Sequence, residues 1–425
     1  MSSPELRDLL DGTVTAIPDD RAVRLAAALG VAPAQLANGA THELSVIVMT
    51  AAELRATCRP IQRDGIHFYN YYSMAGPPGH VAPVILDILC PAGRAPQLNN
   101  GHLEPAITVN LGPGDIYGRW AEDLTSDSWR VMAANRDDRA WICGDSYVEP
   151  SFCPHSYSLA SERPARIISY TGQSYLADLL SELNHWTPAA FEAFIDDIGS
   201  GEPAVLLRSI LRRHGFTAAT AADATDSSRE GLKRWLAGRY DALSLRDLRS
   251  LGERLGFDYR ILLPAPRHHE ELGLTYCSIE QSRASVRTFA TYKVASMASA
   301  SHLPGLCGLF MMIRSGKATG RATLDIVDST ETHYMVLDGE ATLAWDLPDG
   351  SDGEAQLATD GTAWVAPYVR HGWTGDATVI RLSSGRHVSY LDQLELTNTF
   401  SAEATLRRGW RDRRGWGYDD AAGSS

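Results

Sequence analysis

Long apolar runs are absent from this sequence of 425 residues, and so are the marks of secretion. No run approaches the roughly 20 apolar residues that a membrane-spanning helix requires. The first residues, MSSPELRD, lack the basic and then apolar composition of a signal peptide. We therefore expect a cytoplasmic protein without a membrane partner.

Lysine is almost missing as well. The sequence has only Lys233, Lys293 and Lys317, so arginine carries nearly all of its positive charge. Acidic residues are more numerous, and the formal net charge is −13 at pH 7. Nucleic-acid binding needs a basic surface, so this balance argues against a nucleic-acid partner.

Paired cysteines are the third absence, since the six cysteines include no CxxC motif. In a reducing compartment such scattered cysteines are expected to be free and to pack as small apolar side chains. Cys153 lies two residues before His155 and is a possible metal ligand, but Glu149 is the better-placed candidate.

A comparison of the chain with itself shows a repeat. The segment at 21–36, RAVRLAAALGVAPAQL, matches DLRSLGERLGFDYRIL at 247–262, and both have the pattern of a short amphipathic helix that ends at a glycine. GDSYVEP at 144–150 likewise matches GTAWVAP at 361–367, and each is followed by a histidine, His155 or His371. His102 is paired with His333, because each precedes a short apolar strand.

Short apolar runs between glycine and proline turns follow in both halves, which is typical of a sandwich or barrel. The predicted fold is mainly β with α, a tandem repeat of a small helical part followed by a β-barrel. Three helices, at 204–213, 228–237 and 243–255, predict that the second helical part is helix-turn-helix-like. The predicted parts are a truncated helical part at 1–40, a metal-binding barrel at 41–178, the second helical part at 179–266, a degenerate metal-free barrel at 267–400, and a C-terminal strap at 401–425.

Candidate metal ligands gather around the first copy of the repeated motif. Residues 144–155 fit Gly-Asp-x₄-Pro-x₄-His, which resembles the second motif of cupin barrels. His155 ends this motif, Glu149 precedes its proline, and His102 comes from an earlier hairpin. Two imidazoles and one carboxylate suit Fe(II) and leave positions open for substrate and O₂. Zn(II) could take the same ligands but could not perform redox chemistry.

The second copy of the motif is an internal control. It keeps His333 and His371 but has Ala366 where the first copy has Glu149. Two histidines without a carboxylate make a weak ferrous site, so we expect one Fe(II) per chain. His102, Glu149 and His155 would be both its ligands and the catalytic residues.

Three longer strings resemble the 2-hydroxyethylphosphonate dioxygenase family, a relative of the methylphosphonate synthases. They are RPIQRDGIHFYNYY at 59–72, NNGHLEPAITVNLGPGD at 99–115 and GDSYVEPSFCPHSYS at 144–158. The resemblance implies tandem helical and cupin parts with iron in the first barrel. It also implies cleavage of the carbon–carbon bond of 2-hydroxyethylphosphonate by O₂ to hydroxymethylphosphonate and formate, as in antibiotic biosynthesis. No 2-oxoglutarate is needed, because the substrate supplies all four electrons.

The resemblance also implies which side chains bind the phosphonate: Arg63, Tyr71 and Asn99. Arg63 can form a charge-assisted bidentate pair with a phosphonate, and Tyr71 and Asn99 can donate hydrogen bonds to it. A homo-oligomer is expected. The chain departs from the family pattern in one respect: it has no lysine before Lys233 to match the one that members carry in their N-terminal helical part. Three alternatives follow: Arg7, Arg21 or Arg24 takes the place of that lysine, the phosphonate is bound more weakly, or the substrate or product differs.

Other functions stay open at this point. Methylphosphonate synthase would act on the same substrate, although that branch has glutamine at the place of Glu149. The related phosphonate epoxidases carry a glutamate four residues after the first histidine, where this chain has Ala106. A helix-turn-helix and cupin transcription regulator would explain the helices at 204–263, but not the acidic balance of the chain.

Overall fold

The computed structural model describes most of the chain between residues 45 and 411. The described residues are 7, 45–63, 65–78, 80–94, 97–120, 129–137, 141–198, 202–225, 228–264, 275–316, 322–346, 352–385 and 388–411. The predicted helical part at 1–40, with its repeat segment at 21–36, lies outside them except for Arg7. The same holds for residues 412–425 of the predicted strap.

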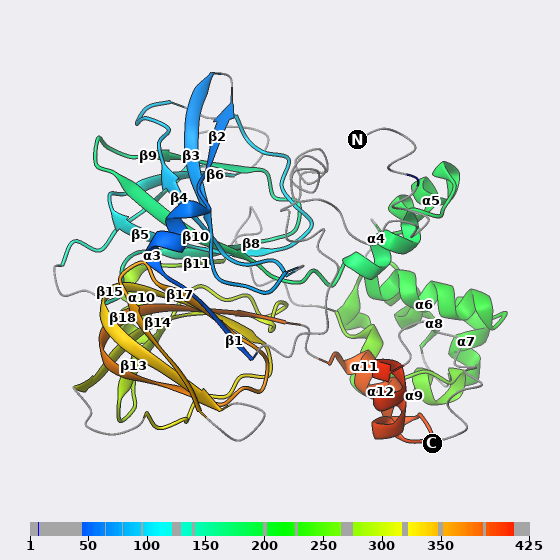
Figure 1. Cartoon of the computed structure of the whole chain (residues 1–425). Coiled ribbons are helices and arrows are strands. Elements are labelled where there is room, and N and C mark those ends of the chain that lie inside the picture. Colours follow the sequence, from blue (N-terminus) through cyan, green and yellow to red (C-terminus); the bar gives the residue numbers. More distant parts are fainter. Residues whose placement is uncertain are drawn as a thin grey trace. The chain divides into compact units, whose positions relative to one another are not determined.

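The chain divides into two compact units, one of residues 1–173 with 269–425 and the other of residues 174–268. The first unit contains both barrels, and the second contains helices (Figure 1). A mainly-sheet fold with two barrels and a helical part is thus as the sequence predicted. The tandem repeat of the helical part stays a prediction, because its first copy is not described. No helix in the described part of the chain is long and apolar enough to cross a membrane.

The first barrel is built from two antiparallel sheets. The larger has the order β11-β8-β5-β10-β4-β3-β2, and the smaller has the order β7-β6-β9. Buried aromatic and aliphatic side chains, among them Trp120, Tyr147 and Tyr157, fill the space between them. The strand bounds are β2 Arg59–Arg63, β3 Ile66–Ser73, β4 Val84–Ile88, β5 Ala106–Pro113, β6 Ile116–Trp120, β7 Trp129–Met132, β8 Ser146–Glu149, β9 His155–Leu159, β10 Ala165–Thr171 and β11 Thr275–Cys277.

The second barrel is a single sheet of longer strands, with the order β1-β17-β15-β18-β14-β13-β12 and β16 paired to β15. Its core contains Tyr334, Trp373 and many aliphatic side chains. A third apolar cluster, with Ile107, Tyr170, Phe310 and Leu382, includes residues from both barrels. The bounds are β1 Val46–Met49, β12 Arg287–Thr288, β13 Tyr292–Ser296, β14 Leu306–Gly316, β15 Glu331–Asp346, β16 Asp352–Ala358, β17 Thr362–Val365 and β18 His371–Ser384.

The two barrels exchange their leading strands. β1 precedes the first barrel in sequence but pairs with β17 of the second. β11 precedes the second barrel but pairs with β8 of the first. A short helix with a capping box follows each exchanged strand, α3 (Ala51–Ala56) after β1 and α10 (Ile279–Ala284) after β11. The domain bounds drawn from the sequence stay predictions, and this exchange is a feature that they did not include.

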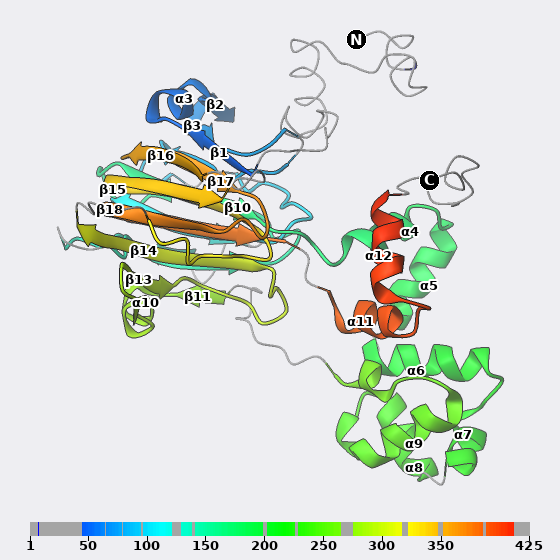
Figure 2. The ribbon, with the colours of Figure 1, turned by 60° about the horizontal axis from the view of Figure 1, so that its bottom comes forward.

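The helical unit surrounds a core of its own, in which Leu207, Leu232, Trp235, Leu251 and Leu262 are fully buried. Three of its helices, α6, α8 and α9, match the predicted segments (Figure 2). The last of them ends at Gly256, which has the left-handed conformation. Its bounds are α4 Ala177–Leu183, α5 Pro188–Ile198, α6 Glu202–Arg213, α7 Ala218–Thr225, α8 Arg229–Leu236 and α9 Leu245–Leu255, with 3₁₀ turns at Tyr240–Ala242 and Tyr259–Leu262. After the second barrel come α11 (Tyr390–Thr397) and α12 (Ala402–Arg411).

The predicted pairing of His102 with His333 is wrong. In the strand ladders, Thr108 faces Tyr147 and His333 faces Trp364. Tyr147 and Trp364 occupy the same place in the two copies of the motif, so His333 corresponds to Thr108, in the middle of its strand. The two histidines were matched by residue type, which carries no information about strand register.

Candidate metal centre

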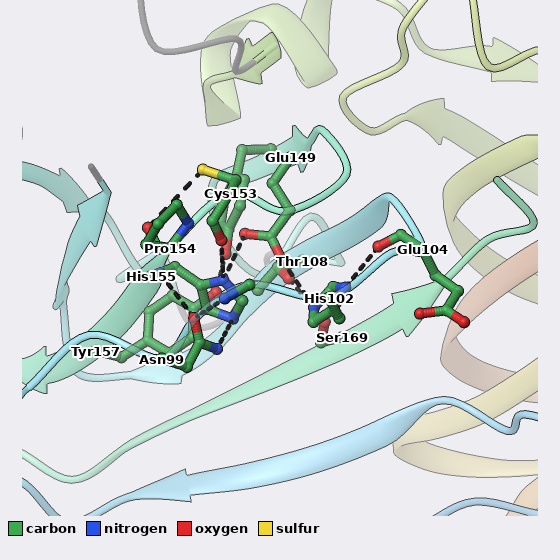
Figure 3. A network of polar contacts seen from close by, with 12 residues as sticks. Asn99, His102, Glu104, Thr108, Glu149, Cys153, Pro154, His155, Tyr157 and Ser169 are labelled. Atoms are coloured by element: carbon green, nitrogen blue, oxygen red, sulfur yellow. Dashed lines mark hydrogen bonds and ion pairs between the residues drawn. The ribbon is translucent and has the colours of Figure 1, made fainter. Parts of the chain in front are cut away.

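Three side chains converge at one end of the first barrel (Figure 3). Glu149 is the last residue of β8, His155 is the first residue of β9, and His102 lies in the loop before β5. Nε2 of His102 is 3.3 Å from Oε1 of Glu149, and Nδ1 of His155 is 3.5 Å from Oε2. One potential ligand atom from each residue lies within 4.8 Å of the other two. The described residues thus bring together the three ligands predicted from the sequence.

Local backbone contacts explain why these residues meet. Ala106, at the start of β5, pairs with Glu149, so the loop that carries His102 lies beside the end of β8. The Phe152 N–H donates to the His102 carbonyl at 2.6 Å and joins the two ligand-bearing loops. Gly101 has a φ of +71°, and a Cβ at this position would lie 2.4 Å from the carbonyl carbon of Phe152. A glycine is therefore required where the two loops touch.

Backbone carbonyls fix the tautomer of both histidines. Nδ1 of His102 is 2.5 Å from the carbonyl oxygen of Glu104, and Nδ1 of His155 is 2.9 Å from that of Cys153. A carbonyl can only accept, so each Nδ1 carries the proton and each Nε2 keeps its lone pair. Metal-bound histidines in proteins are oriented by this kind of contact.

The carboxylate of Glu149 has the environment of a metal ligand. Its side chain is only 1% exposed, and Oε2 accepts no hydrogen bond from the described residues. A buried anion without a donor is costly unless a cation is bound beside it. Burial alone would lower the pKa of His102, but the hydrogen bonds and charges of Glu149 and Glu104 together offset it, so the pKa is raised. The donor set therefore fits a divalent metal ion.

Asn99 is tied to His155 by its backbone and its side chain. Its Oδ1 accepts the N–H groups of His155 and Gly101, at 2.9 and 3.0 Å. Because both contacts need an acceptor, the amide orientation is fixed. The NH₂ group is therefore the part that lies 2.9 Å from Nε2 of His155, beside the metal-ligating lone pair. Asn99 thus presents a hydrogen-bond donor at the metal position.

The comparisons with known proteins agree with this geometry. Residues 55–172 match the family model described as the 2-hydroxyethylphosphonate dioxygenase cupin-like domain. The chain is 52% identical over 417 residues to 2-hydroxyethylphosphonate dioxygenase of Streptomyces viridochromogenes, covering 98% of this chain and 93% of that protein. The chain belongs to the 2-hydroxyethylphosphonate dioxygenase family.

Solved structures support membership of this family over nearly the whole chain. PhpD with cadmium atoms is 50% identical, with a TM-score of 0.76 and coverage of 97% of this chain and 94% of that one. PhpD with cadmium complexed with hydroethylphosphonate (HEP) has the same identity and TM-score, with coverage of 96% and 93%. As a member of the 2-hydroxyethylphosphonate dioxygenase family the chain is an oxidoreductase, as the sequence predicted. These likenesses do not support a transcription regulator.

The other predicted substrate residues of this family member, Tyr71 and Arg63, belong to strands β3 and β2 of the first barrel. Tyr71 is half-buried on β3, and a series of ring contacts through Tyr69 and Tyr157 joins it to His155, with centroid distances of 6.1, 6.4 and 5.7 Å. Arg63 is the last residue of β2, opposite Ile66, and its side chain lies outside the described part. Their contact with a phosphonate stays a prediction.

The N-terminal phosphonate contact of the family also stays open. Arg21 and Arg24 lie outside the described residues, and Arg7 is exposed. Cys153, the weaker ligand candidate, is not part of the three-residue group. Its Sγ is 3.8 Å from the carbonyl oxygen of Pro154, and burial, together with the charge of Glu149, raises the pKa of its thiol to about 12.

In this member of the 2-hydroxyethylphosphonate dioxygenase family, the second barrel has a histidine, His371, at the position of His155 in the first barrel. The side chains around His371 differ from those around His155. His371 pairs with Trp345 as His155 pairs with Trp120. Its Nε2, however, is 2.7 Å from the hydroxyl of Tyr334. Tyr334 and its ladder partner Arg381 stand where the first barrel has Val109 and Ile168. Arg381 forms an ion pair with Asp328, so this region contains a cation of its own.

Two features of the site could not be found from side-chain patterns. The carbonyls of Glu104 and Cys153 that fix the histidine tautomers belong to the backbone, and any residue type would supply them. Asp145 was part of the motif, but its contacts with residues of the second barrel depend on the exchanged strand β11. A signal for these contacts would need the strand register, which one sequence does not give.

Proposed function

We propose that the protein uses one Fe(II) at His102, Glu149 and His155 to cleave 2-hydroxyethylphosphonate with O₂ into hydroxymethylphosphonate and formate. The observation that carries this proposal is the donor set: two imidazoles and one buried carboxylate whose Oε2 accepts no hydrogen bond from the described residues. Such a set suits ferrous iron and leaves positions open for other ligands. The relative named 2-hydroxyethylphosphonate dioxygenase is 52% identical to this chain over 417 residues.

The reaction balances without a further reductant. One 2-hydroxyethylphosphonate and one O₂ contain the atoms of one hydroxymethylphosphonate and one formic acid. The carbon–carbon bond breaks, both oxygen atoms enter the products, and the substrate supplies all four electrons that reduce O₂. Bound iron would supply the one-electron steps that let triplet O₂ react with a closed-shell substrate. Zn(II) in the same ligands would hold the substrate but leave it unreacted.

The side chains around the ligands would bind and orient the substrate. The Asn99 amide, fixed by its two backbone contacts, would donate to a phosphonate oxygen once it releases Nε2 of His155. Tyr71 and Arg63 would donate from β3 and β2 to the remaining oxygens, and the charge of Arg63 would balance that of the dianion. His102 is 32% exposed, whereas Glu149 is 1% exposed, so the substrate would approach the metal from the His102 side.

Phosphorus NMR tests the proposal directly. Enzyme loaded anaerobically with Fe(II) and given 2-hydroxyethylphosphonate should, on admission of air, convert the substrate signal into that of hydroxymethylphosphonate. Unchanged substrate would reject the activity, and methylphosphonate would assign the chain to the synthase reaction. The cytoplasmic location, the homo-oligomer and the absence of a nucleic-acid partner stay predictions.

A further inference from the structure

The strand that ends in Glu149, β8, pairs on one side with a strand from the segment that leads into the second barrel. β8 lies between β5 and β11, and β11 belongs to the segment that leads into the second barrel. The paired residues of β11 and β8 are Thr275 with Val148, Tyr276 with Tyr147, and Cys277 with Ser146. Ser146 Oγ also accepts the N–H of Ala298, at 2.9 Å. The outer side of the Glu149 strand therefore depends on the sequence that leads into the second barrel.

A carboxylate joins the exchanged strand to the start of β8. Asp145 directly precedes β8 and is 5% exposed. Its Oδ1 accepts the N–H of Ile279, at the start of α10, at 2.9 Å, and its Oδ2 accepts the hydroxyl of Tyr276. Oδ2 also accepts the N–H of Ala133 from the first barrel, at 2.8 Å. We call the contact between Tyr276 and Asp145 the β11 clamp.

The second barrel provides an internal comparison, because it also has an exchanged strand. There β1 pairs with β17, and Met49 and Ile47 face Thr362 and Trp364. By ladder position Thr362 corresponds to Asp145, and Ile47 corresponds to Tyr276. Neither a carboxylate nor a phenol is present, so the clamp cannot form. It occurs at the barrel that has Glu149 and is missing from the barrel that has Ala366 in its place.

We propose that Tyr276, acting through Asp145, is a positioning residue for Glu149, so that the exchanged strand of the second barrel sets the place of the metal carboxylate. Ligands need support that fixes them to within about 0.5 Å. β8 is a short strand, and Glu149 stands at its end beyond the last β11 pair, so its position follows that of the strand. Residues that hydrogen-bond directly to metal ligands typically change metal affinity by about 10- to 100-fold, and a contact that acts through the strand of the ligand is expected at the lower end of that range.

The test compares two tyrosines whose hydroxyls each donate a hydrogen bond that links the sequence of one barrel to that of the other. Tyr276→Phe removes the clamp. Tyr170→Phe is the matched control: Tyr170 lies on β10, two strands from β8, is 1% exposed, and donates to Oε1 of Glu331 in the second barrel at 2.9 Å. Full-length wild type and both variants are titrated anaerobically with Fe(II) and with Co(II). The unfolding temperature of each metal-free protein and the visible spectrum of each Co(II) complex are recorded.

The proposal expects Tyr276→Phe to bind Fe(II) about 10-fold more weakly, with an altered Co(II) spectrum. Tyr170→Phe should keep the affinity and spectrum of the wild type, although both variants lose a similar amount of thermal stability. Wild-type affinity in Tyr276→Phe, or an equal loss in both variants, overturns the clamp as a positioning device. The proposal rests on the metal centre of the proposed function, and a wild type that binds neither ion would reject that function instead.

Discussion

At the scale of single residues, the site separates binding the metal from holding its ligands in place. The imidazoles of His102 and His155 and the Glu149 carboxylate are the potential donors, whereas backbone carbonyls orient the two rings. Glu149 is the only anion of the three. Its loss would leave two neutral imidazoles, which hold ferrous iron poorly.

Glu149→Ala should therefore lose iron. After anaerobic loading and desalting, we expect the variant to contain almost no Fe(II) by metal analysis, whereas the wild type contains one per chain. Glu104→Ala is a matched control, because Glu104 contributes its carbonyl to His102 and its side chain is not part of the metal group. A normal iron content in Glu149→Ala would remove Glu149 from the ligand set.

Asn99→Asp separates the two roles of Asn99. The aspartate keeps an oxygen that can accept from His155 and Gly101, but it replaces the NH₂ donor by a second oxygen. Loss of a hydrogen bond to a charged group costs about 1.5–3 kcal/mol, so KM for the phosphonate should rise by about 10- to 100-fold. Iron content should remain that of the wild type. An unchanged KM would show that Asn99 does not contact the substrate.

At the scale of elements, the metal centre depends on two loops that touch at Gly101 and Phe152. Both have positive φ, +71° and +57°. The loop contact places His102 beside the end of β8. A change in this contact should therefore weaken metal binding by moving His102, although none of the three ligands is altered.

Gly101→Ala tests this contact, with Gly93→Ala as its control. Both glycines have positive φ, but a Cβ on Gly93 would meet no atom within 4 Å, whereas one on Gly101 would meet the Phe152 backbone. Gly93→Ala should cost about 1 kcal/mol of unfolding free energy from backbone strain alone and leave metal affinity unchanged. Gly101→Ala should cost more and also weaken Fe(II) binding in an anaerobic titration. Equal behaviour of the two variants would argue against the loop contact.

How much the sequence could predict differs from element to element. Glu149 and His155 could be recognised because their types and spacing in one motif reflect the chemistry of the site, and His102 because it is a second imidazole in an earlier hairpin. The helices at 204–213, 228–237 and 243–255 could be predicted from their periodicity. The exchange of β1 and β11 could not, because a strand has the same alternating pattern whichever sheet it joins. His333 was misassigned for the same reason, since only the ladder shows that it corresponds to Thr108.

At the scale of the whole molecule, the barrels share strands and are expected to unfold together. The barrel contacts also bury His333, which is fully buried with Nδ1 3.0 Å from the carbonyl oxygen of Ala75. Burial lowers the pKa of His333 to about 4, and burial likewise lowers that of His371 to about 4.

These two histidines predict how stability depends on pH. Their pKa in the folded protein lies below the ordinary value of 6.5, so the unfolded chain binds protons that the folded chain does not. Their contribution is present above pH 6.5 and is lost as the pH falls toward 4. Each should remove roughly 2 kcal/mol of unfolding free energy between pH 7 and pH 5.

Urea unfolding of the metal-free protein at pH 7 and pH 5 measures this loss. His333→Leu should lose less unfolding free energy than the wild type between pH 7 and pH 5, by the roughly 2 kcal/mol that one histidine contributes. This holds even if the variant is less stable at pH 7. The same pH difference in wild type and variant would show that His333 can be protonated in the folded protein.

The central claim is that one iron at His102, Glu149 and His155 couples O₂ to cleavage of 2-hydroxyethylphosphonate without another reductant. The most direct measurement is the stoichiometry of that reaction, with an oxygen electrode for O₂ and enzymatic assay for formate. We predict one O₂ consumed and one formate released for each phosphonate cleaved, in buffer with Fe(II)-loaded enzyme and no 2-oxoglutarate or ascorbate. Turnover that requires an added reductant, or O₂ uptake without formate, would contradict the account.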